Sequence, residues 1–182
     1  MSLKVITGKL KKSNIKVPAC AKPVKNIIKQ SAFTIIEEYL KGAEILDLFA
    51  GSGALGIEAL SRGASFCTFV ENNYEAVETI QENLINLNLD EKAEVLHKDV
   101  LKFLGETSAN YDIVFADPPY DLPIKHFLKT VHLAVKEEGI FILFHPKKLK
   151  EIEPTGFKFV KKRCFGKTCY SIFLREKQEQ GK

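Results

Sequence analysis

The sequence predicts an α/β fold in which helices cover a mostly parallel sheet that ends in an antiparallel C-terminal hairpin. Short apolar runs alternate with helical patterns from about residue 44 onward, as in a series of β-α-β units. The last two runs, 157–164 and 168–174, alternate in polarity and are separated by only three residues, which is typical of a hairpin. A length of 182 residues suits one domain with a substantial core.

The individual elements follow from the same patterns. Five apolar runs predict core strands, and the hairpin brings the sheet to seven; the five runs are 45–50, 66–71, 93–97, 111–116 and 140–144. Apolar residues at 77, 80, 84 and 87 have the spacing of a helix face. The predicted helices of this part of the chain cover 54–61, 74–87, 100–104 and 124–135.

The first 40 residues differ from the rest. Residues 4–18 predict a small hairpin that turns at 12–14, and the apolar positions within 24–40 predict an amphipathic helix. We therefore divide the chain into an N-terminal extension, 1–40, a main domain, 41–176, and a frayed tail, 177–182.

The net charge of +4 conceals an uneven distribution. Residues 1–30 carry eight lysines and no acid, and residues 147–182 carry eleven Lys or Arg against four Glu. The middle, 31–146, has eight basic and nineteen acidic residues, a net of −11. Basic ends beside an acidic middle favour a polyanionic partner such as nucleic acid, and the alternative is a solvated lysine surface.

Composition also excludes some classes. No run approaches the ~20 apolar residues that span a bilayer, and the start of the chain lacks the apolar core of a signal peptide. The four cysteines show neither Cys-x-x-Cys pairing nor a zinc-finger spacing with His, so we expect a reduced, cytoplasmic protein without a metal. Cys164 and Cys169, on neighbouring predicted strands, are expected to be packing thiols rather than a disulfide.

A polar motif, Asp117-Pro118-Pro119-Tyr120, directly follows the fourth predicted core strand. Open α/β sheets bind ligands at this carboxyl edge of the strands. The prolines end the strand in an extended conformation and leave the Pro118 carbonyl free beside the Asp117 carboxylate. Two acceptors next to an aromatic face suit a planar group with an exocyclic amine, such as a nucleobase. The alternative is a Pro-Pro turn with an exposed tyrosine.

A glycine-rich loop follows the first core strand. Gly51, Gly53 and Gly56 form Gly-x-Gly-x-x-Gly, and Glu71 lies twenty residues beyond Gly51, which is also the pattern of a nicotinamide-dinucleotide site. Asp47 argues against that alternative, because a buried carboxylate would repel a pyrophosphate. S-adenosylmethionine, which carries a sulfonium, an ammonium and no phosphate, fits better.

Two further acids suit the same ligand. Glu71 is placed to accept from both ribose hydroxyls, and Asp99 from the adenine amino group, although Asp99 can equally be the N-cap of the following helix. Asn83 is expected on the surface. The predicted cofactor-binding residues are Asp47, Phe49, Ala50, Gly51, Ser52, Gly53, Glu71, Asn72, Asp99 and Val100.

With these motifs in place, the chain resembles the bacterial small-subunit ribosomal RNA guanine-N2 methyltransferases. The resemblance is carried by the unbroken run 47–64, by Phe69-Val70-Glu71 and by Asp117-Pro118-Pro119-Tyr120. Further support comes from Val5-Ile6-Thr7-Gly8, His145-Pro146 and the run 163–168. It implies a Rossmann-like class I methyltransferase fold, S-adenosylmethionine as cofactor and methylation of the N2 amine of a guanine in small-subunit rRNA.

The predicted roles follow from the motif and the resemblance. Asp117 and the Pro118 carbonyl accept the two N–H groups of the amine, Pro119 holds the turn, and Tyr120 stacks on a guanine taken out of its stack. The basic N-terminal segment is expected to bind RNA, naked or within an assembled subunit, and the protein to act as a monomer without membrane or metal. The predicted RNA-binding residues are Lys9, Lys11, Lys12, Lys16, Lys22, Lys25 and Lys29. Cations of the predicted C-terminal hairpin, Lys161, Lys162, Arg163 and Lys167, are expected to add to these contacts.

One segment departs from the family pattern. The family usually opens its first long helix with an Arg-Pro-Thr-x-x-x-Arg-like block, where this chain has 22–29, with Val24, Asn26 and Ile27 at the Thr, Asp and Arg positions. Two alternatives therefore stay open: an adenine-N6 methyltransferase acting on DNA or RNA, and a homologue that binds cofactor or RNA without full activity. A protein glutamine methyltransferase fits less well, because that family favours Asn at the position of Asp117.

Overall fold

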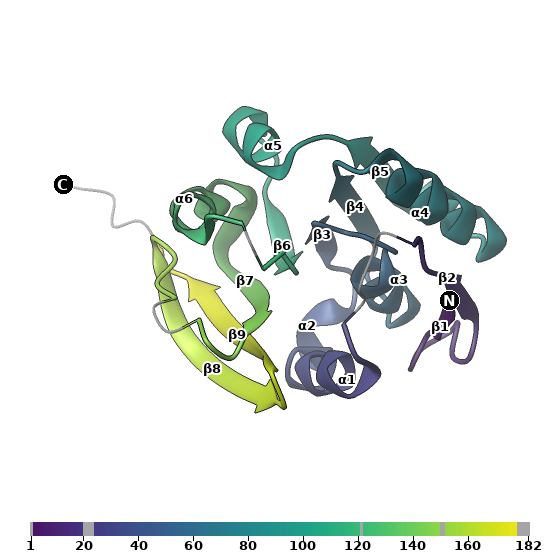
Figure 1. Cartoon of the computed structure of the whole chain (residues 1–182), viewed down its shortest axis with the longest axis horizontal. Helices are drawn as coiled ribbons and strands as arrows, with labels where there is room; N and C mark the ends of the chain where they lie inside the picture. Colours follow the sequence, from purple (N-terminus) through teal and green to yellow (C-terminus); the bar gives the residue numbers. More distant parts are fainter. Residues whose placement is uncertain (1, 20–23, 121, 150–151, 178–182) are drawn as a thin grey trace.

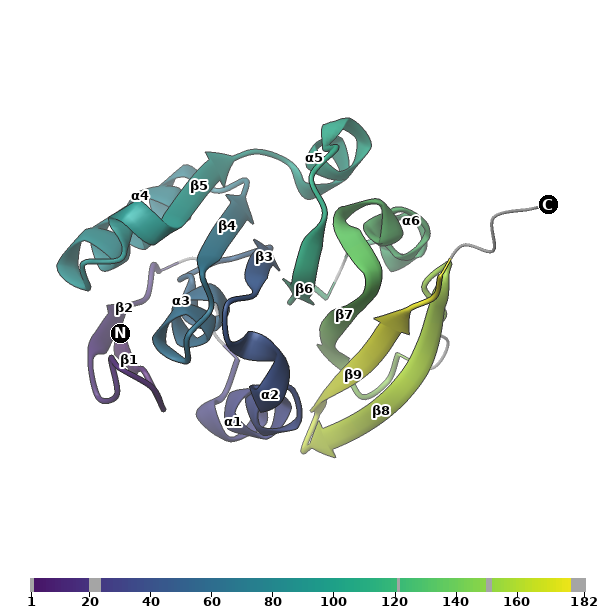
Figure 2. The same cartoon turned by 180° about the vertical axis from the view of Figure 1, so that it is seen from behind.

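The computed structural model describes the chain except for residues 1, 20–23, 121, 150–151 and 178–182. It has three layers (Figures 1 and 2). A seven-stranded sheet in the order β5-β4-β3-β6-β7-β9-β8 lies in the middle. One apolar cluster joins the sheet to α1, α3 and α4, and a second joins its other face to α5 and α6. The predicted α/β fold with its closing hairpin is confirmed.

Five neighbouring strands are parallel and the hairpin is antiparallel. The strands are β3 (Glu44–Leu48), β4 (Phe66–Glu71), β5 (Ala93–His97), β6 (Tyr111–Ala116), β7 (Val135–Pro146), β8 (Phe157–Phe165) and β9 (Thr168–Arg175). The main departure from prediction is β7, which begins at Val135 rather than 140. Glu138, which has a φ of 60°, and Gly139 lie inside this strand. Because they interrupt the apolar pattern, the sequence did not indicate that the strand begins before residue 140.

The helices follow the predicted spacing with two breaks. The predicted helix 24–40 is divided at Ile36, and the predicted helix 124–135 ends in a 3-10 turn. The helical segments are α1 (Asn26–Ile35), α2 (Glu37–Leu40), α3 (Ala54–Ser61), α4 (Tyr74–Asn86), α5 (Val100–Glu106), α6 (Ile124–Thr130), and the 3-10 turns Asp90–Lys92 and Val131–Ala134.

The N-terminal extension is bound to the main domain through α3. It begins with a hairpin of β1 (Ser2–Lys4) and β2 (Asn14–Lys16). The buried Glu58 carboxylate of α3 accepts hydrogen bonds from the backbone N–H of Ile6 and Thr7 at 2.8 and 3.0 Å. At Gly8, where φ is +89°, a Cβ atom would lie 2.0 Å from the Ser61 carbonyl oxygen, so only glycine fits this contact.

The same Glu58 forms a buried charge cluster with two cations. Arg62 Nε donates to it at 2.9 Å, and Lys29 Nζ, on α1, lies 3.4 Å away. Lys29 and Glu58 are fully buried, and burial lowers the pKa of Lys29 although Glu58 opposes the shift. Lys29 was predicted to face RNA. That prediction is wrong: the position falls on the inner face of α1, beside Ile28 and Ala32 in the core.

Candidate functional site

The carboxyl ends of β3, β4, β5 and β6 lie side by side and carry the predicted cofactor and amine-binding motifs. The loop after β3 makes a tight turn, in which Phe49, Gly51 and Gly53 have φ of 58°, 56° and 73°. Gly56, in the first turn of α3, has no space for a side chain, because a Cβ would lie 2.3 Å from Phe69 Cε1 and 2.5 Å from Cys67 Sγ. The loop therefore brings its own backbone to the sheet edge and packs α3 closely on β4.

Asp47 lies beneath this loop on β3 and is 1% exposed. Its Oδ2 accepts from the Gly56 N–H at 2.9 Å, whereas Oδ1 is buried without a hydrogen-bond partner among the described residues. Burial raises the pKa of Asp47 to about 8, and the nearby Asp117 and Glu71 carboxylates add to the shift. An unpaired carboxylate oxygen at this position suits a donor or cation from a ligand.

Glu71, at the end of β4, organises the loops that follow β3 and β4. Its Oε2 accepts from the Gly51 N–H at 2.8 Å, and its Oε1 accepts from the N–H groups of Asn72 and Asn73 at 2.9 Å each. A carboxylate has about four lone-pair sites, so these three bonds leave little capacity for both hydroxyls of a ribose. That predicted role requires at least one of these backbone bonds to be shared or replaced.

The Asp99 side chain is exposed and acts as the N-cap of α5, since its Oδ1 accepts from the Lys102 N–H at 3.0 Å. Asp99 Oδ2 has no hydrogen-bond partner among the described residues. Asp99 can therefore cap α5 and still accept a hydrogen bond from the adenine amine. Val100, at the start of α5, is buried. Ala50 and Ser52 are buried within the loop after β3. The Phe49 ring packs against Phe127, with the two ring centroids 5.5 Å apart.

The motif after β6 has the arrangement expected for an amine receptor. Asp117 is half-buried, and burial raises its pKa to about 7. Pro118 and Pro119 line a cavity of about 40 Å³ with Tyr120, His145 and Pro146. Because this space is small, a base at the motif would lie mainly against its mouth.

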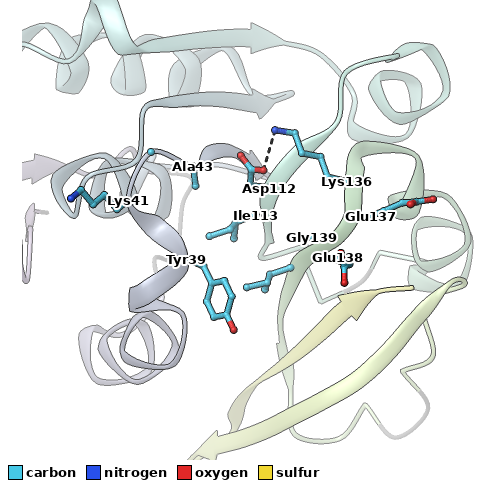
Figure 3. A pocket seen from close by; sticks show the side chains of 11 residues that line it. Tyr39, Lys41, Ala43, Asp112, Ile113, Lys136, Glu137, Glu138 and Gly139 are labelled. Atoms are coloured by element: carbon cyan, nitrogen blue, oxygen red, sulfur yellow. Dashed lines mark ion pairs between the residues drawn. The ribbon is translucent and has the colours of Figure 1, made fainter. Parts of the chain in front are cut away.

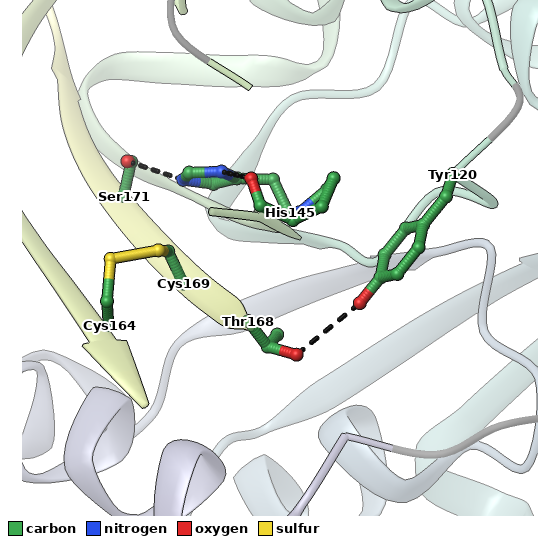
Figure 4. Close-up of a disulfide and its surroundings, with 7 residues drawn as sticks. Tyr120, His145, Cys164, Thr168, Cys169 and Ser171 are labelled. Carbon is green, nitrogen blue, oxygen red and sulfur yellow. Dashed lines mark hydrogen bonds between the residues drawn. A yellow bond between two sulfur atoms is a disulfide. The ribbon is translucent and has the colours of Figure 1, made fainter. Parts of the chain in front are cut away.

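Tyr120 is 60% exposed, and its hydroxyl lies 3.4 Å from Thr168 Oγ1 on β9 (Figure 4). Its ring is thus available for stacking and is tied at one end to the C-terminal hairpin. Thr168 was not among the predicted site residues. Its neighbours 163–167 include two basic residues and no acid, and only the topology brings this hairpin turn to the end of β6.

The tip of that hairpin contains a disulfide between Cys164 and Cys169 (Figure 4). The prediction of two packing thiols is wrong for this pair, because the register of β8 and β9 places the two residues directly opposite each other. Cys67 is a free, buried thiol, and Cys20 lies outside the described residues.

Asn83, predicted on the surface, is buried and joins three segments. Its side chain accepts from the Lys16 N–H at 2.8 Å and donates to the carbonyls of Lys16 and Ser52 at 2.9 and 3.2 Å. It thereby connects α4 to both the N-terminal extension and the cofactor loop. An asparagine on the apolar face of the helix, one position from Leu84, was the signal in the sequence.

The predicted RNA-binding lysines are not all at this edge. Lys25, at the start of α1, is exposed, and Lys22 lies outside the described residues. Lys16 is exposed but paired with Glu82 at 2.6 Å. The other exposed members of the set, Lys9, Lys11 and Lys12, follow Gly8 beside the last residue of α3, at the opposite edge of the sheet.

A cavity of about 350 Å³ also lies at that opposite edge (Figure 3). Lys136 spans it and pairs with Glu44 and Asp112 at 2.9 and 3.0 Å. The charges of Lys136, Glu44 and Asp112 are thus already paired with one another. Among the described residues, no group of three or more His, Cys, Asp or Glu could hold a metal ion, and no helix has both the length and the apolarity to cross a membrane.

This sheet order, with a glycine loop after β3, an acid after β4 and a closing hairpin, defines the Rossmann-like class of S-adenosylmethionine-dependent methyltransferases. The chain belongs to the family described as Conserved hypothetical protein 95, which matches residues 3–174.

Relatives of the chain carry related descriptions. It is 33% identical over 175 residues to the Ribosomal RNA small subunit methyltransferase D of Buchnera aphidicola, covering 91% of this chain and 90% of that protein. The protein of that description from Escherichia coli is 26% identical, with 97% and 91% covered. A solved structure entitled "Putative methyltransferase yhhF from Escherichia coli" superposes with a TM-score of 0.87 at 26% identity, over 98% of this chain and 100% of that one.

Proposed function

We propose that the protein transfers a methyl group from S-adenosylmethionine to the exocyclic N2 amine of a guanine in small-subunit ribosomal RNA. The observation that carries the proposal is the half-buried Asp117 beside Pro118 at the end of β6, next to the glycine loop and the unpaired Asp47 oxygen. The names of relatives support rRNA as the substrate.

The residues present fit the cofactor. The loop 49–53 has the left-handed turns that allow close backbone approach, and the buried Asp47 Oδ1 lacks a donor that a ligand can supply. S-adenosylmethionine, when bound, supplies a methyl group on a positively charged sulfonium. Glu71 and Asp99 are placed for the ribose and the adenine amine, and both retain some acceptor capacity.

The chain's contribution to chemistry is positioning. Asp117 and the Pro118 carbonyl each accept one N–H of the amine, which holds its nitrogen lone pair out of conjugation with the ring. The exposed ring of Tyr120 stacks on the base. Ionised Asp117 is the better acceptor, and its pKa of about 7 makes the ionised form abundant at neutral pH and above. Orientation and electrostatic preorganisation provide the rate.

Replacement of Asp117 tests this proposal. We expect Asp117→Asn and Asp117→Ala to reduce methylation by roughly 10²-fold or more, in line with other preorganised polar contacts. Cofactor affinity is expected to be retained, since removing the Asp117 charge relieves its repulsion of Asp47. The matched control is Asp90→Asn, at an exposed aspartate in a 3-10 turn. Unchanged turnover, or loss of cofactor binding with Asp117→Asn, contradicts the assignment.

Nucleoside analysis of the product identifies the target. Labelled S-adenosylmethionine is incubated with naked rRNA or with assembled small subunits, and the RNA is digested. N2-methylguanosine is the expected product. N6-methyladenosine indicates the adenine alternative, and no label in either substrate indicates a homologue without activity.

A further inference from the structure

The C-terminal hairpin brings a basic surface to the candidate site. Its turn lies at the carboxyl edge of the sheet, where Thr168 pairs with Pro146 and the Lys147 N–H donates to the Lys167 carbonyl at 2.8 Å. Thr168 also lies within hydrogen-bond distance of Tyr120. A cation on this turn is therefore a short distance from the ring expected to stack on the target base.

The charge of this hairpin is unbalanced. Residues 154–175 contain six Lys or Arg and no acid. We define the hairpin-tip surface as the exposed basic residues near the end of β8, in the turn and in the loop that follows β7: Lys147, Lys148, Lys162, Arg163 and Lys167. None of these five takes part in a salt bridge with another described residue, unlike Lys16, Lys98 and Lys136. Their charges are thus available to phosphate groups.

The lysines of the N-terminal hairpin are less well placed. Lys9 N–H donates to the Ser61 carbonyl at 2.8 Å, at the last residue of α3. Because α3 starts at the cofactor loop and has eight residues, its end is about 12 Å from that loop. Figures 1 and 2 show the two hairpins on opposite sides of the molecule, and only the C-terminal one turns beside Tyr120.

The hairpin tip is also held in one conformation. The disulfide between Cys164 and Cys169 connects its two strands immediately before and after the turn. A surface that is ordered before binding loses less conformational entropy when it meets a ligand.

We infer that the hairpin-tip surface, rather than the N-terminal hairpin, is the main phosphate-binding surface for RNA around the target base. This inference rests on the proposed function, because it takes RNA as the substrate. It reverses the order of importance predicted from the sequence, in which the first 30 residues supplied the main phosphate contacts and the C-terminal hairpin only added to them. Lys25, an exposed member of that earlier set, lies outside the N-terminal hairpin, at the start of α1.

Two triple variants with equal charge change test the inference. The hairpin-tip variant carries Lys162→Gln, Arg163→Gln and Lys167→Gln, and the matched control carries Lys9→Gln, Lys11→Gln and Lys12→Gln, all at exposed positions. The affinity of each protein for a small-subunit rRNA fragment is measured across a salt series. Melting temperature and affinity for S-adenosylmethionine are measured alongside, to verify that both variants retain the fold and the cofactor site.

We expect the hairpin-tip variant to bind RNA at least about tenfold more weakly and to lower the salt slope by about 2, since each phosphate contact contributes roughly 0.7 on single strands. The control should stay within about twofold of the unaltered protein. Equal loss in both variants, greater loss in the control, or no measurable RNA binding by the unaltered protein overturns the inference. If the hairpin-tip variant does not fold, Lys147→Gln with Lys148→Gln, on the adjacent loop, provides the same comparison.

The outcome also separates this inference from the proposed function. Methylation of rRNA by a protein whose RNA binding depends on Lys9, Lys11 and Lys12 overturns the surface assignment and leaves the activity intact. RNA binding that depends on the hairpin tip, without methyl transfer to any rRNA substrate, overturns the activity and leaves the surface assignment intact.

Discussion

The charge cluster around Glu58 should be the main link between the N-terminal extension and the rest of the protein. In Glu58→Gln the fully buried Lys29 loses its counter-ion, Arg62 loses its charged acceptor, and the acceptor of two backbone N–H groups becomes a neutral amide. Leaving a buried charge unpaired costs about 3–5 kcal/mol. For a domain of this size that corresponds to a fall in melting temperature of roughly 6–20 °C.

Urea and thermal unfolding of four variants, Glu58→Gln, Lys29→Met, their combination and Glu82→Gln, measure this cost. Glu82→Gln is the control, because its pair with Lys16 is exposed on both sides and should contribute no more than about 1 kcal/mol. Lys29→Met combined with Glu58→Gln should be less destabilising than the sum of the two single changes, since the double variant leaves no unpaired Lys29 charge. A Glu58→Gln protein within about 0.5 kcal/mol of the unaltered one, or strict additivity, would refute the reasoning.

Three other measurements check the site. Gly56→Ala should lower stability by about 1–3 kcal/mol through its contact with Phe69, whereas Gly105→Ala, with nothing within 4 Å, should raise it by about 0.4–1 kcal/mol. Alkylation of the denatured, unreduced protein should modify two of the four cysteines, and reduction should remove about 2 kcal/mol of stability; four reactive thiols before reduction would contradict the disulfide. The rate at low concentrations of both RNA and S-adenosylmethionine should rise with pH to a plateau above about 7, the pKa to which burial raises Asp117 in the protein without cofactor, and a flat profile under these conditions would exclude that carboxylate as the acceptor.

The sign of the pH dependence of stability follows from the difference in proton binding between the native and unfolded states. Burial raises the pKa of Asp117 from 3.8 to about 7 and that of Asp47 to about 8. Between about pH 4 and 8 the ligand-free native protein therefore binds more protons than the unfolded chain, and its stability should fall as the pH rises through that window. Asp117→Asn should flatten the fall, and a stability that rises across this range contradicts the burial of both carboxylates.

The sequence predicted the layers and the edge of the sheet well because local patterns determine both. Alternating apolar runs identify strands, and Asp47, the glycines, Glu71 and Asp117 each lie at or just after the carboxyl end of a strand, where parallel topology brings them together. The misassigned residues depend on contacts between distant segments.

Lys29 is polar in sequence, yet it becomes a core residue only because Glu58, 29 positions later, is also buried there. Asn83 is buried because the N-terminal extension lies over α4. The pairing of Cys164 with Cys169 requires the register of the hairpin, which a single residue's shift would change. Charge counted along the chain likewise does not show that two basic termini lie on opposite sides of the molecule.

The arrangement of acids distinguishes between the two ligands that the glycine loop could bind, S-adenosylmethionine and a nicotinamide dinucleotide. Asp47, Glu71 and Asp117 approach one another closely enough that the last two raise the pKa of the first. Lys29 partly offsets this repulsion at Asp47, yet the pKa of Asp47 is still raised to about 8, and a pyrophosphate would add further negative charge. A ligand that carries a sulfonium and an ammonium instead stabilises the ionised forms and provides a donor for the unpaired Asp47 oxygen. The same ionisation leaves Asp117 as a stronger acceptor for the amine of the base. Ionisation of the acids thus favours both the binding of the cationic cofactor and the acceptance of an N–H of the amine by Asp117.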